Sequence, residues 1–237
     1  MTMRDRLICI AGFGDNASMF SPLQDTSLTD VVDVVPLNLP GFGAPSPEEQ
    51  TTTLAALAEY VDAQARELGA RFILAHSVAS IIASLAAQPD GSPLQLILSL
   101  EGNLTADDAY FSGSAAAYEN PHTFRIDFLK RLDAMAIDQP IIARYRHTVA
   151  DADPTAIWEL GCDAQAFSSV HVPGEVLRAA ADVVYFYNPD NVPENSLKWL
   201  NANPLKTCVL PNASHWPSID QPKELAAAIS EALSQRK

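Results

Sequence analysis

The sequence contains few cysteines, few basic residues and no long apolar run, and each scarcity excludes a class of protein. Its 237 residues include three cysteines, which are too few and too widely spaced for a disulfide framework or a zinc site: Cys9, Cys162 and Cys208. No stretch approaches the roughly 20 apolar residues of a membrane-spanning helix, and no signal-like apolar run precedes the first expected strand. We therefore expect a cytoplasmic protein without a membrane partner.

Positive charge is scarce compared with negative charge. Lysine and arginine together number 15 against 29 aspartates and glutamates, which gives a formal net charge of −14. So acidic a surface repels phosphate backbones and anionic lipid, so we expect no nucleic-acid partner. Net charge does not identify the substrate, and nothing in the sequence indicates an oligomeric state. With 48% hydrophobic residues, the chain can bury a sizeable core.

Short apolar segments alternate with amphipathic ones along most of the chain. Strands are expected at 7–11, 30–37, 72–75, 94–100, 183–187 and 207–210, and helices at 51–68, 77–88 and 222–235. This alternation predicts an α/β fold, with a mostly parallel twisted sheet and helices on both of its faces. It breaks between 103 and 180, where a helical pattern with scattered aromatic residues predicts a cap over the carboxyl ends of the strands. The core would then comprise residues 1–102 and 181–237.

Ser77 stands where an expected strand turns into a helix without an intervening loop. A serine on such a corner is strained, has an exposed hydroxyl and lies beside the first amides of the helix, as a nucleophile requires. Small residues are needed two positions before and after it, and here they are Ala75 and Ala79. The alternative is that Ser77 simply caps the helix.

A nucleophilic serine needs a base, and the base needs a carboxylate to orient it. His215 follows the last expected strand and Asp190 follows the one before it. Loops after parallel strands open at one edge of the sheet, which is also the edge of Ser77. Glu101, at the end of the fourth expected strand, competes with Asp190: it could reach His215, bind a polar substrate atom or serve as a cap. Asp190 could equally be an ordinary turn residue.

In combination, these features resemble the α/β-hydrolase fold superfamily over nearly the whole length of the chain. The matching segments are the glycine-rich loop at 12–14, the Leu-Pro-Gly-Phe-Gly loop at 39–43, the serine corner, the Asp190 loop and the Ser-His-Trp-Pro loop at 214–217. The order of these segments and the position of the cap agree with the superfamily as well.

The resemblance implies that Ser77 is the nucleophile, His215 the base and Asp190 the orienting acid. It also implies an oxyanion hole formed by the backbone amides of Phe13 and Val78. The chain departs from the common pattern in having Ala11 where a histidine is frequent, and alanines instead of glycines around Ser77.

The expected function is hydrolysis of a small, largely apolar acyl compound (an ester, thioester, lactone or amide) through an acyl-enzyme. The residues expected to line the substrate pocket are Gly12, Phe13, Met19, Phe42, Glu101 and Trp216. No metal ion or organic cofactor is expected, because the chain has neither metal-ligand spacing nor a phosphate-binding loop. A lyase or acyltransferase at the same site, or a non-catalytic ligand-binding protein, remains an alternative.

Overall fold

A six-stranded sheet lies at the centre of the computed structural model, which describes residues 4–46, 51–88 and 90–235. Its strand order is β2-β1-β5-β6-β7-β8, and every neighbouring pair is parallel. The strands are β1 (Arg6–Ile10), β2 (Asp33–Leu37), β5 (Phe72–His76), β6 (Leu96–Leu100), β7 (Asp182–Tyr187) and β8 (Lys206–Val209). The α/β fold with a parallel sheet is therefore confirmed.

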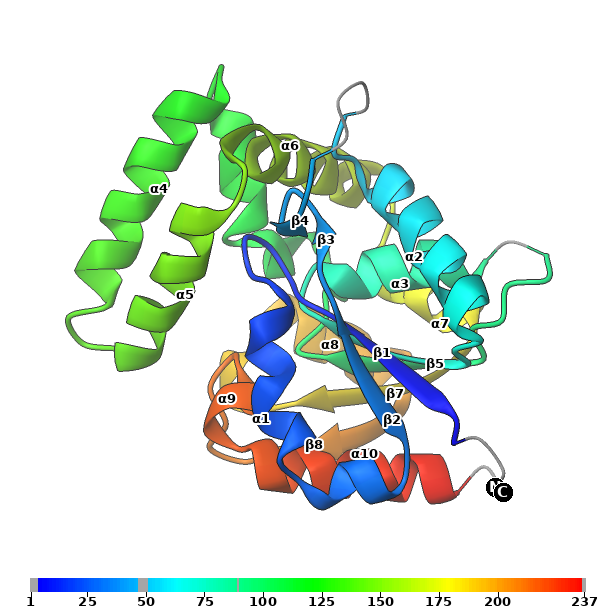
Figure 1. Cartoon of the computed structure of the whole chain (residues 1–237). Helices are drawn as coiled ribbons and strands as arrows, with labels where there is room; N and C mark the ends of the chain where they lie inside the picture. Colours follow the sequence, from blue (N-terminus) through cyan, green and yellow to red (C-terminus); the bar gives the residue numbers. More distant parts are fainter. Residues whose placement is uncertain (1–3, 47–50, 89, 236–237) are drawn as a thin grey trace.

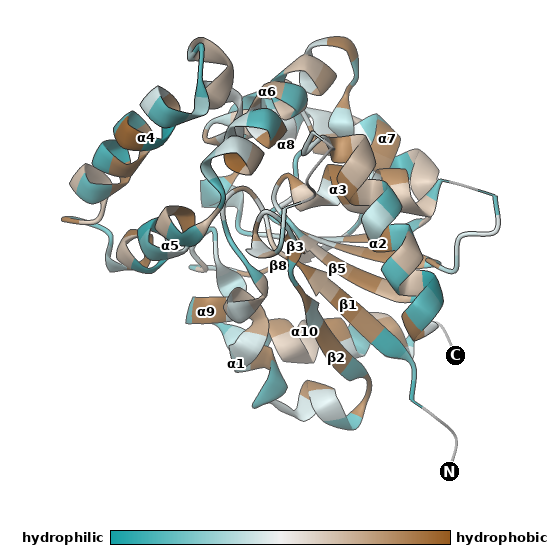
Figure 2. Ribbon diagram, turned by 45° about the horizontal axis from the view of Figure 1, so that its top comes forward, coloured by the Kyte–Doolittle hydropathy of each residue, from teal (hydrophilic) through white to brown (hydrophobic). Residues whose placement is uncertain are grey.

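Helices cover both faces of this sheet (Figure 1). On one face α2 (Leu54–Leu68) packs on α3 (Ala79–Ala87), with α7 (Pro173–Ala180) beside α3. On the other face lie α1 (Ser21–Gln24) and α10 (Pro222–Ser234). Every residue of β5 and β6 is buried, which is why both strands are apolar except for His76 and Ser99. Figure 2 shows the hydrophobic strands enclosed by helices of mixed polarity.

The long segment between β6 and β7 is helical, as its sequence predicted. Its elements are η3 (Ala106–Ala109), η4 (Ser112–Ala117), α4 (Pro121–Met135), α5 (Pro140–Asp151), α6 (Pro154–Val170) and α7. Helices α4 and α5 pack against each other and extend away from the sheet, whereas α6 crosses above the carboxyl ends of the strands (Figure 1). We call α4, α5 and α6 the cap helices. Helix α7 lies on the core beside α3 instead of with them.

The boundaries of α2 follow from its terminal residues. Thr53 precedes the helix, and its hydroxyl accepts a hydrogen bond from the Ala56 amide at 3.1 Å. Gly69 ends the helix in the left-handed conformation, with φ of +62°, and donates its N–H to carbonyls of the last turn. Leu57 and Val61 lie on the buried face between these ends. The expected helix is thus confirmed, beginning three residues later than its first threonine.

Several short elements were not expected from the sequence. Strand β2 begins at Asp33, since the preceding residues Ser27–Asp30 form a 3-10 turn, η2, capped by Thr26. The other unexpected elements are η1 (Ala17–Phe20), β3 (Leu39–Pro40), β4 (Gly43–Ala44), η5 (Pro189–Asn191), α8 (Glu194–Ala202) and α9 (Pro217–Asp220). Within the described residues, no helix has both the length and the apolar character needed to cross a membrane.

Candidate active site

Ser77 occupies a sharp corner between β5 and α3. Its φ is +55°, a left-handed value that a residue with a side chain adopts at a cost of about 1–3 kcal/mol. The corner is held in place because the Ser77 N–H donates to Leu100 O at 2.9 Å and the Ser77 carbonyl accepts from the Ser80 amide at 2.9 Å. Val78 occupies the cap position of α3, and no side chain caps the helix there. The Ser77 hydroxyl is therefore not used as a helix cap.

The loop after β1 packs directly on this corner. A Cβ added to Gly12 would lie 2.9 Å from Ser77 Cβ and 2.9 Å from the carbonyl oxygen of His76, so only glycine fits. Ala75 and Ala79, the small residues on either side of Ser77, are completely buried. The close crossing that the sequence predicted for this corner is present, with alanines in the usual glycine positions.

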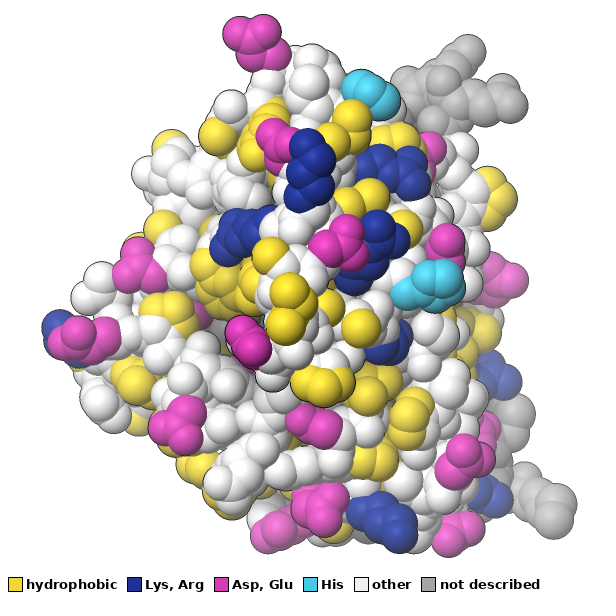
Figure 3. All heavy atoms as spheres, turned by 90° about the vertical axis from the view of Figure 1, so that its left-hand side faces the viewer, with side chains coloured by type: hydrophobic (Ala, Val, Ile, Leu, Met, Phe, Trp, Pro, Cys, Tyr) yellow, Lys and Arg dark blue, Asp and Glu magenta, His cyan; other side chains and the backbone are white. Residues whose placement is uncertain are grey.

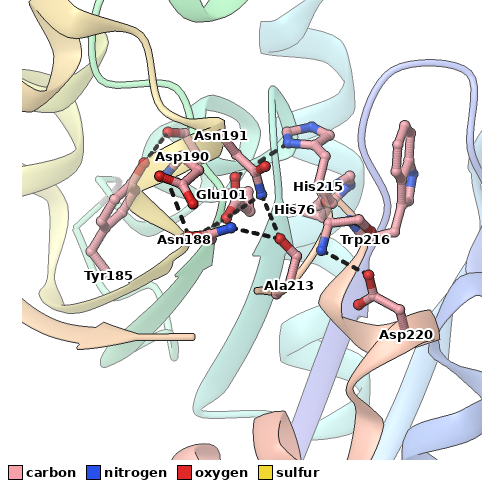
Figure 4. A network of polar contacts seen from close by, with 12 residues as sticks. His76, Glu101, Tyr185, Asn188, Asp190, Asn191, Ala213, His215, Trp216 and Asp220 are labelled. Atoms are coloured by element: carbon pink, nitrogen blue, oxygen red, sulfur yellow. Dashed lines mark hydrogen bonds and ion pairs between the residues drawn. The ribbon is translucent and has the colours of Figure 1, made fainter. Parts of the chain in front are cut away.

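His215 faces Glu101, which follows the end of β6. The Nδ1 atom of His215 lies 3.4 Å from Glu101 Oε2 (Figure 4). The other carboxylate oxygen, Oε1, accepts hydrogen bonds from the Asn188 amide at 2.7 Å and from Asn191 Nδ2 at 3.3 Å. Glu101 is only 5% exposed. The carboxylate is thus fixed from behind, with its second oxygen directed at the imidazole.

Asp190, the carboxylate expected beside His215, lies elsewhere. It is exposed on the turn η5, and its own amide donates to Asn188 Oδ1 at 3.3 Å. The side chains of Asn188 and Asn191 both donate to the carbonyl of Ala213, at 2.8 and 3.1 Å (Figure 4). They therefore occupy the side of the turn that faces residues 211–217, which carry His215 and which we call the histidine loop. His215 therefore contacts Glu101, which the sequence analysis gave as the alternative to Asp190. Asp190 is not part of this contact.

His76, the last residue of β5, contacts the backbone of the histidine loop. Its Nε2 atom lies 2.7 Å from the carbonyl oxygen of His215, and the two imidazole rings are 4.7 Å apart. Burial, followed by the charge of His215, lowers the pKa of His76 well below its ordinary value. His76 is therefore neutral and donates its Nε2–H to that carbonyl. This contact could not be predicted from the sequence, because 139 residues separate His76 from His215.

The two amides proposed for the oxyanion hole are available to a ligand. Within the described residues, neither Phe13 N–H nor Val78 N–H donates to another protein group. Phe13 follows Gly12, which touches Ser77, and Val78 is the next residue after Ser77. Both amides therefore belong to segments in contact with the serine corner, and their role as an oxyanion hole stays a prediction.

Ser77 and His215 share the wall of a narrow cavity under the cap. Its free volume is about 10 Å³, roughly enough for one water molecule. The other lining residues are Phe13, Asp15, His76, Asp108, Tyr110, Phe111, Ser112, Tyr145 and Trp216. In the part of the chain that is described, no hydrogen bond joins Ser77 to His215.

A wider outer cavity of about 200 Å³ adjoins this inner one. It shares four wall residues with it (Tyr110, Phe111, His215 and Trp216) and extends between the α4–α5 connection and the histidine loop. Of the expected pocket residues, Phe13 and Trp216 line the inner cavity, while Gly12 and Glu101 lie behind Ser77 and His215. Met19 and Phe42 are buried in the core and line neither cavity.

Asp108, which lines the inner cavity together with Asp15, accepts hydrogen bonds from residues close to it in the fold. It accepts the amides of Leu104 and Thr105, both at 2.8 Å, and the hydroxyl of Ser196 at 2.6 Å. Burial raises the pKa of Asp108, and these hydrogen bonds oppose the rise. Its acceptor sites are used to fix the start of η3. Within the described residues no cluster of three or more His, Cys, Asp or Glu side chains could hold a metal ion.

A sequence profile of the alpha/beta hydrolase family matches residues 7–228, nearly the entire chain. The chain belongs to this family. The parallel sheet, the serine corner and the loop that carries His215 all lie within the matched residues. No protein in the curated set of sequences matches this chain.

Solved structures share the complete fold of this alpha/beta hydrolase family member at low sequence identity. An esterase from Thermogutta terrifontis with bound malate is 18% identical, with a TM-score of 0.74 over 98% of this chain and 90% of the other. An AqdC variant, in complex with the Pseudomonas quinolone signal whose ring it cleaves, is 14% identical, with a TM-score of 0.77 over 99% and 93%. The enol-lactonase from Burkholderia xenovorans LB400 is 15% identical, with a TM-score of 0.71 over 98% and 92%.

Proposed function

We propose that this protein is a serine hydrolase of small, neutral, largely apolar acyl compounds, with Ser77 as nucleophile, His215 as base and Glu101 as the orienting carboxylate. The observation that carries the proposal is the contact of His215 Nδ1 with Glu101 Oε2, at 3.4 Å, on the cavity that Ser77 also lines. A histidine that donates Nδ1–H to a carboxylate keeps Nε2 unprotonated, which is the form that accepts a proton from a serine.

The reaction would proceed through an acyl-enzyme. His215 Nε2 takes the proton of Ser77 Oγ while that oxygen forms a bond to the substrate carbonyl carbon. The negative oxygen of the resulting intermediate accepts the amides of Phe13 and Val78, each such donor contributing about 3 kcal/mol. The intermediate collapses, and His215 protonates the leaving group. Water, deprotonated by His215, then attacks the acyl carbon, and the carboxylic acid leaves with Ser77 restored.

Glu101 would act by holding the imidazole. Asn188 and Asn191 bind its Oε1, so Oε2 remains directed at His215 throughout the cycle. The positive charge that forms on His215 is then stabilised by a buried carboxylate 3.4 Å away. The 3.4 Å separation and the absence of a Ser77–His215 hydrogen bond in the described residues are typical of unliganded active sites, where such contacts tighten in the substrate complex.

The cavity walls support the proposed substrate class. Among the described residues, no lysine or arginine lines the inner or the outer cavity, whereas Asp15 and Asp108 both line the inner one. Arg144 is already paired with Asp15, so an anionic substrate would meet the Asp108 carboxylate without a free cation on the cavity wall. The remaining walls are mainly aromatic and aliphatic. The names of the esterase and the enol-lactonase among the structural neighbours agree with a carboxylic ester or lactone.

Labelling with a small fluorophosphonate tests this proposal. The reagent phosphonylates a serine only when the base activates it, so mass spectrometry should place the adduct on Ser77. Ser77→Ala and His215→Ala should abolish labelling, and Asp190→Asn should retain it. If folded wild-type protein hydrolyses small esters but remains unlabelled, and Ser77→Ala still turns them over, the reaction does not pass through an acyl-enzyme. The proposed role of Ser77 as nucleophile would then be wrong.

A further inference from the structure

The candidate oxyanion loop, residues 12–15, is in contact with the cap as well as with Ser77. Tyr145 and Arg144, adjacent residues of α5, each bind this loop. Tyr145 donates its hydroxyl to the carbonyl of Phe13 at 2.6 Å, and the Arg144 guanidinium pairs with the Asp15 carboxylate. About 130 residues of sequence separate the partners in each pair. These contacts join the cap to the part of the core that carries the Phe13 amide of the candidate oxyanion hole.

The internal geometry of the loop transmits these contacts to the Phe13 amide. The Asp15 N–H donates to Gly12 O at 3.2 Å. Gly12 C=O and Phe13 N–H belong to one planar peptide unit and point in opposite directions. Fixing Asp15 therefore fixes the direction of the Phe13 N–H. Tyr145 binds the Phe13 carbonyl, which belongs to the next peptide unit. The carbonyl groups on either side of the Phe13 N–H are therefore both held by hydrogen bonds.

The packing around the loop leaves little freedom while the cap is in place. Gly14 has φ of +70°, and a Cβ on it would lie 2.8 Å from side-chain atoms of both Ile157 and Val149. Gly12 makes the equivalent close approach to Ser77 on the core side. The loop is therefore enclosed between the serine corner and the cap helices.

The charge of Asp15 makes the contact with α5 necessary. Asp15 is 1% exposed, and its Oδ1 already accepts the Asn16 amide at 2.9 Å. Removing the cation from a buried pair leaves an unpaired charge, which is strongly destabilising. Without Arg144 the carboxylate must turn toward water, and the turn from Asp15 to Gly12 loosens with it. Tyr145 is a dependable donor, because burial and then the charge of Asp15 raise its pKa well above the ordinary value.

We propose that Arg144 and Tyr145 are positioning residues through which the cap completes the oxyanion hole. The inference rests on the proposed function, since it concerns the Phe13 donor of that site. The inner cavity has room for little more than one water molecule, about 10 Å³, so we expect α5 to move away when a substrate enters. That movement releases the loop, and closure over the substrate restores the donor. Substrate binding and catalytic competence are thereby coupled, as in induced fit.

The test compares Tyr145→Phe and Arg144→Gln with two control variants from the same cap. Tyr118→Phe removes a cap tyrosine hydroxyl that lines neither cavity, and Arg146→Gln removes the neighbouring arginine, which pairs with Asp133 instead of the loop. For a neutral p-nitrophenyl ester, the two test variants should lose roughly 10- to 100-fold in kcat, the scale of a misplaced oxyanion donor, with KM changed by less than about threefold. Both controls should behave as wild type.

A transition-state analogue distinguishes positioning from a merely structural role. A trifluoromethyl ketone adds to Ser77 and places its oxyanion in the hole, so its affinity should fall by the same factor as kcat. Arg144→Lys should recover part of the activity, and the double variant should lose little more than either single variant. A rise in KM at unchanged kcat, or unchanged affinity for the ketone, would overturn the inference. Wild-type protein that is not labelled at Ser77 would instead refute the proposed function itself.

Discussion

At the scale of single residues, two carboxylates are candidates for orienting His215, and they differ in how far they are exposed to solvent. Glu101 is buried, and its backbone has φ of +50°, a second strained position at the edge of the site. Asp190 is exposed and on a turn. A buried carboxylate with one oxygen bound by two donors is preorganised, whereas an exposed one would first have to reorient. The distinction can be measured by neutralising each side chain in turn.

Glu101→Gln should lower kcat/KM by about 10²–10⁴-fold, because the amide can present its NH₂ to Nδ1 and so favour the wrong imidazole tautomer. Asp190→Asn should stay within about threefold of wild type. Steady-state hydrolysis of a neutral p-nitrophenyl ester measures both, and circular dichroism checks that each variant is folded. A loss in Asp190→Asn as large as that in Glu101→Gln would return the orienting role to Asp190.

His76 makes a second residue-scale prediction, this time on stability. Its pKa in the folded protein is lowered by burial and by the positive charges of His215 and Arg144, while the unfolded chain has the ordinary value near 6.5. Below pH 6.5 the unfolded state therefore binds a proton that the native state refuses. The free energy of unfolding should fall by about 1.4 kcal/mol per pH unit from this group, until the native pKa is reached, and should be unaffected above pH 6.5.

His76→Gln is the matched variant, because its side-chain amide can still donate to the His215 carbonyl but does not titrate. Urea unfolding at pH 7.5, 6.5 and 5.5 gives the difference between the two proteins, in which contributions of the carboxylates cancel. The wild type should lose stability relative to the variant only at the lowest pH. Parallel pH dependence in the two proteins would show that His76 is protonated in the folded state.

At the scale of elements, the sequence was informative wherever one local pattern determined the structure. Strands β5 and β6 are buried throughout and are apolar except for His76 and Ser99, and Gly69 ends α2 with a positive φ that suits glycine. The contact of Glu101 with His215 was not predictable in the same way. It depends on Asn188 and Asn191 binding the carboxylate across 87 and 90 residues of sequence, and on their orientation in the turn.

The cap shows the same limit. A helical segment between β6 and β7 followed from its pattern, but the role of each helix follows from tertiary contacts alone. Helix α6 is joined to the core by hydrogen bonds from the Thr52 and Leu54 amides to Glu159 and Asp163, both at 2.7 Å. At its start, Asp153 N–H donates to the carbonyl of Gly41 at 2.9 Å. In the described chain, the polar contacts of α5 with the core run through the two residues at the candidate oxyanion loop.

At the scale of the whole molecule, this unequal attachment predicts which part of the cap moves. The α4–α5 pair extends from the body and exposes apolar side chains, with Ile137 at its tip 81% exposed (Figures 1 and 3). Helix α6 contacts both α4 and α2, and hydrogen bonds from Asp153, Glu159 and Asp163 join it to the core. Opening of the closed inner cavity should therefore move α4 and α5 while α6 stays with the sheet.

Hydrogen–deuterium exchange should resolve this motion. Without ligand, amides of α5 and of residues 12–15 should exchange faster than those of α6, because local opening has a low free energy where few contacts must break. Saturation with a trifluoromethyl ketone should slow α5 and residues 12–15 together, by about tenfold or more, since the ligand stabilises the closed state. Tyr145→Phe should break this joint response, leaving α5 protected less than in wild type. Equal protection of α5 and α6 would mean that the cap moves as one body. The expectation that α5 moves relative to α6 would then be wrong.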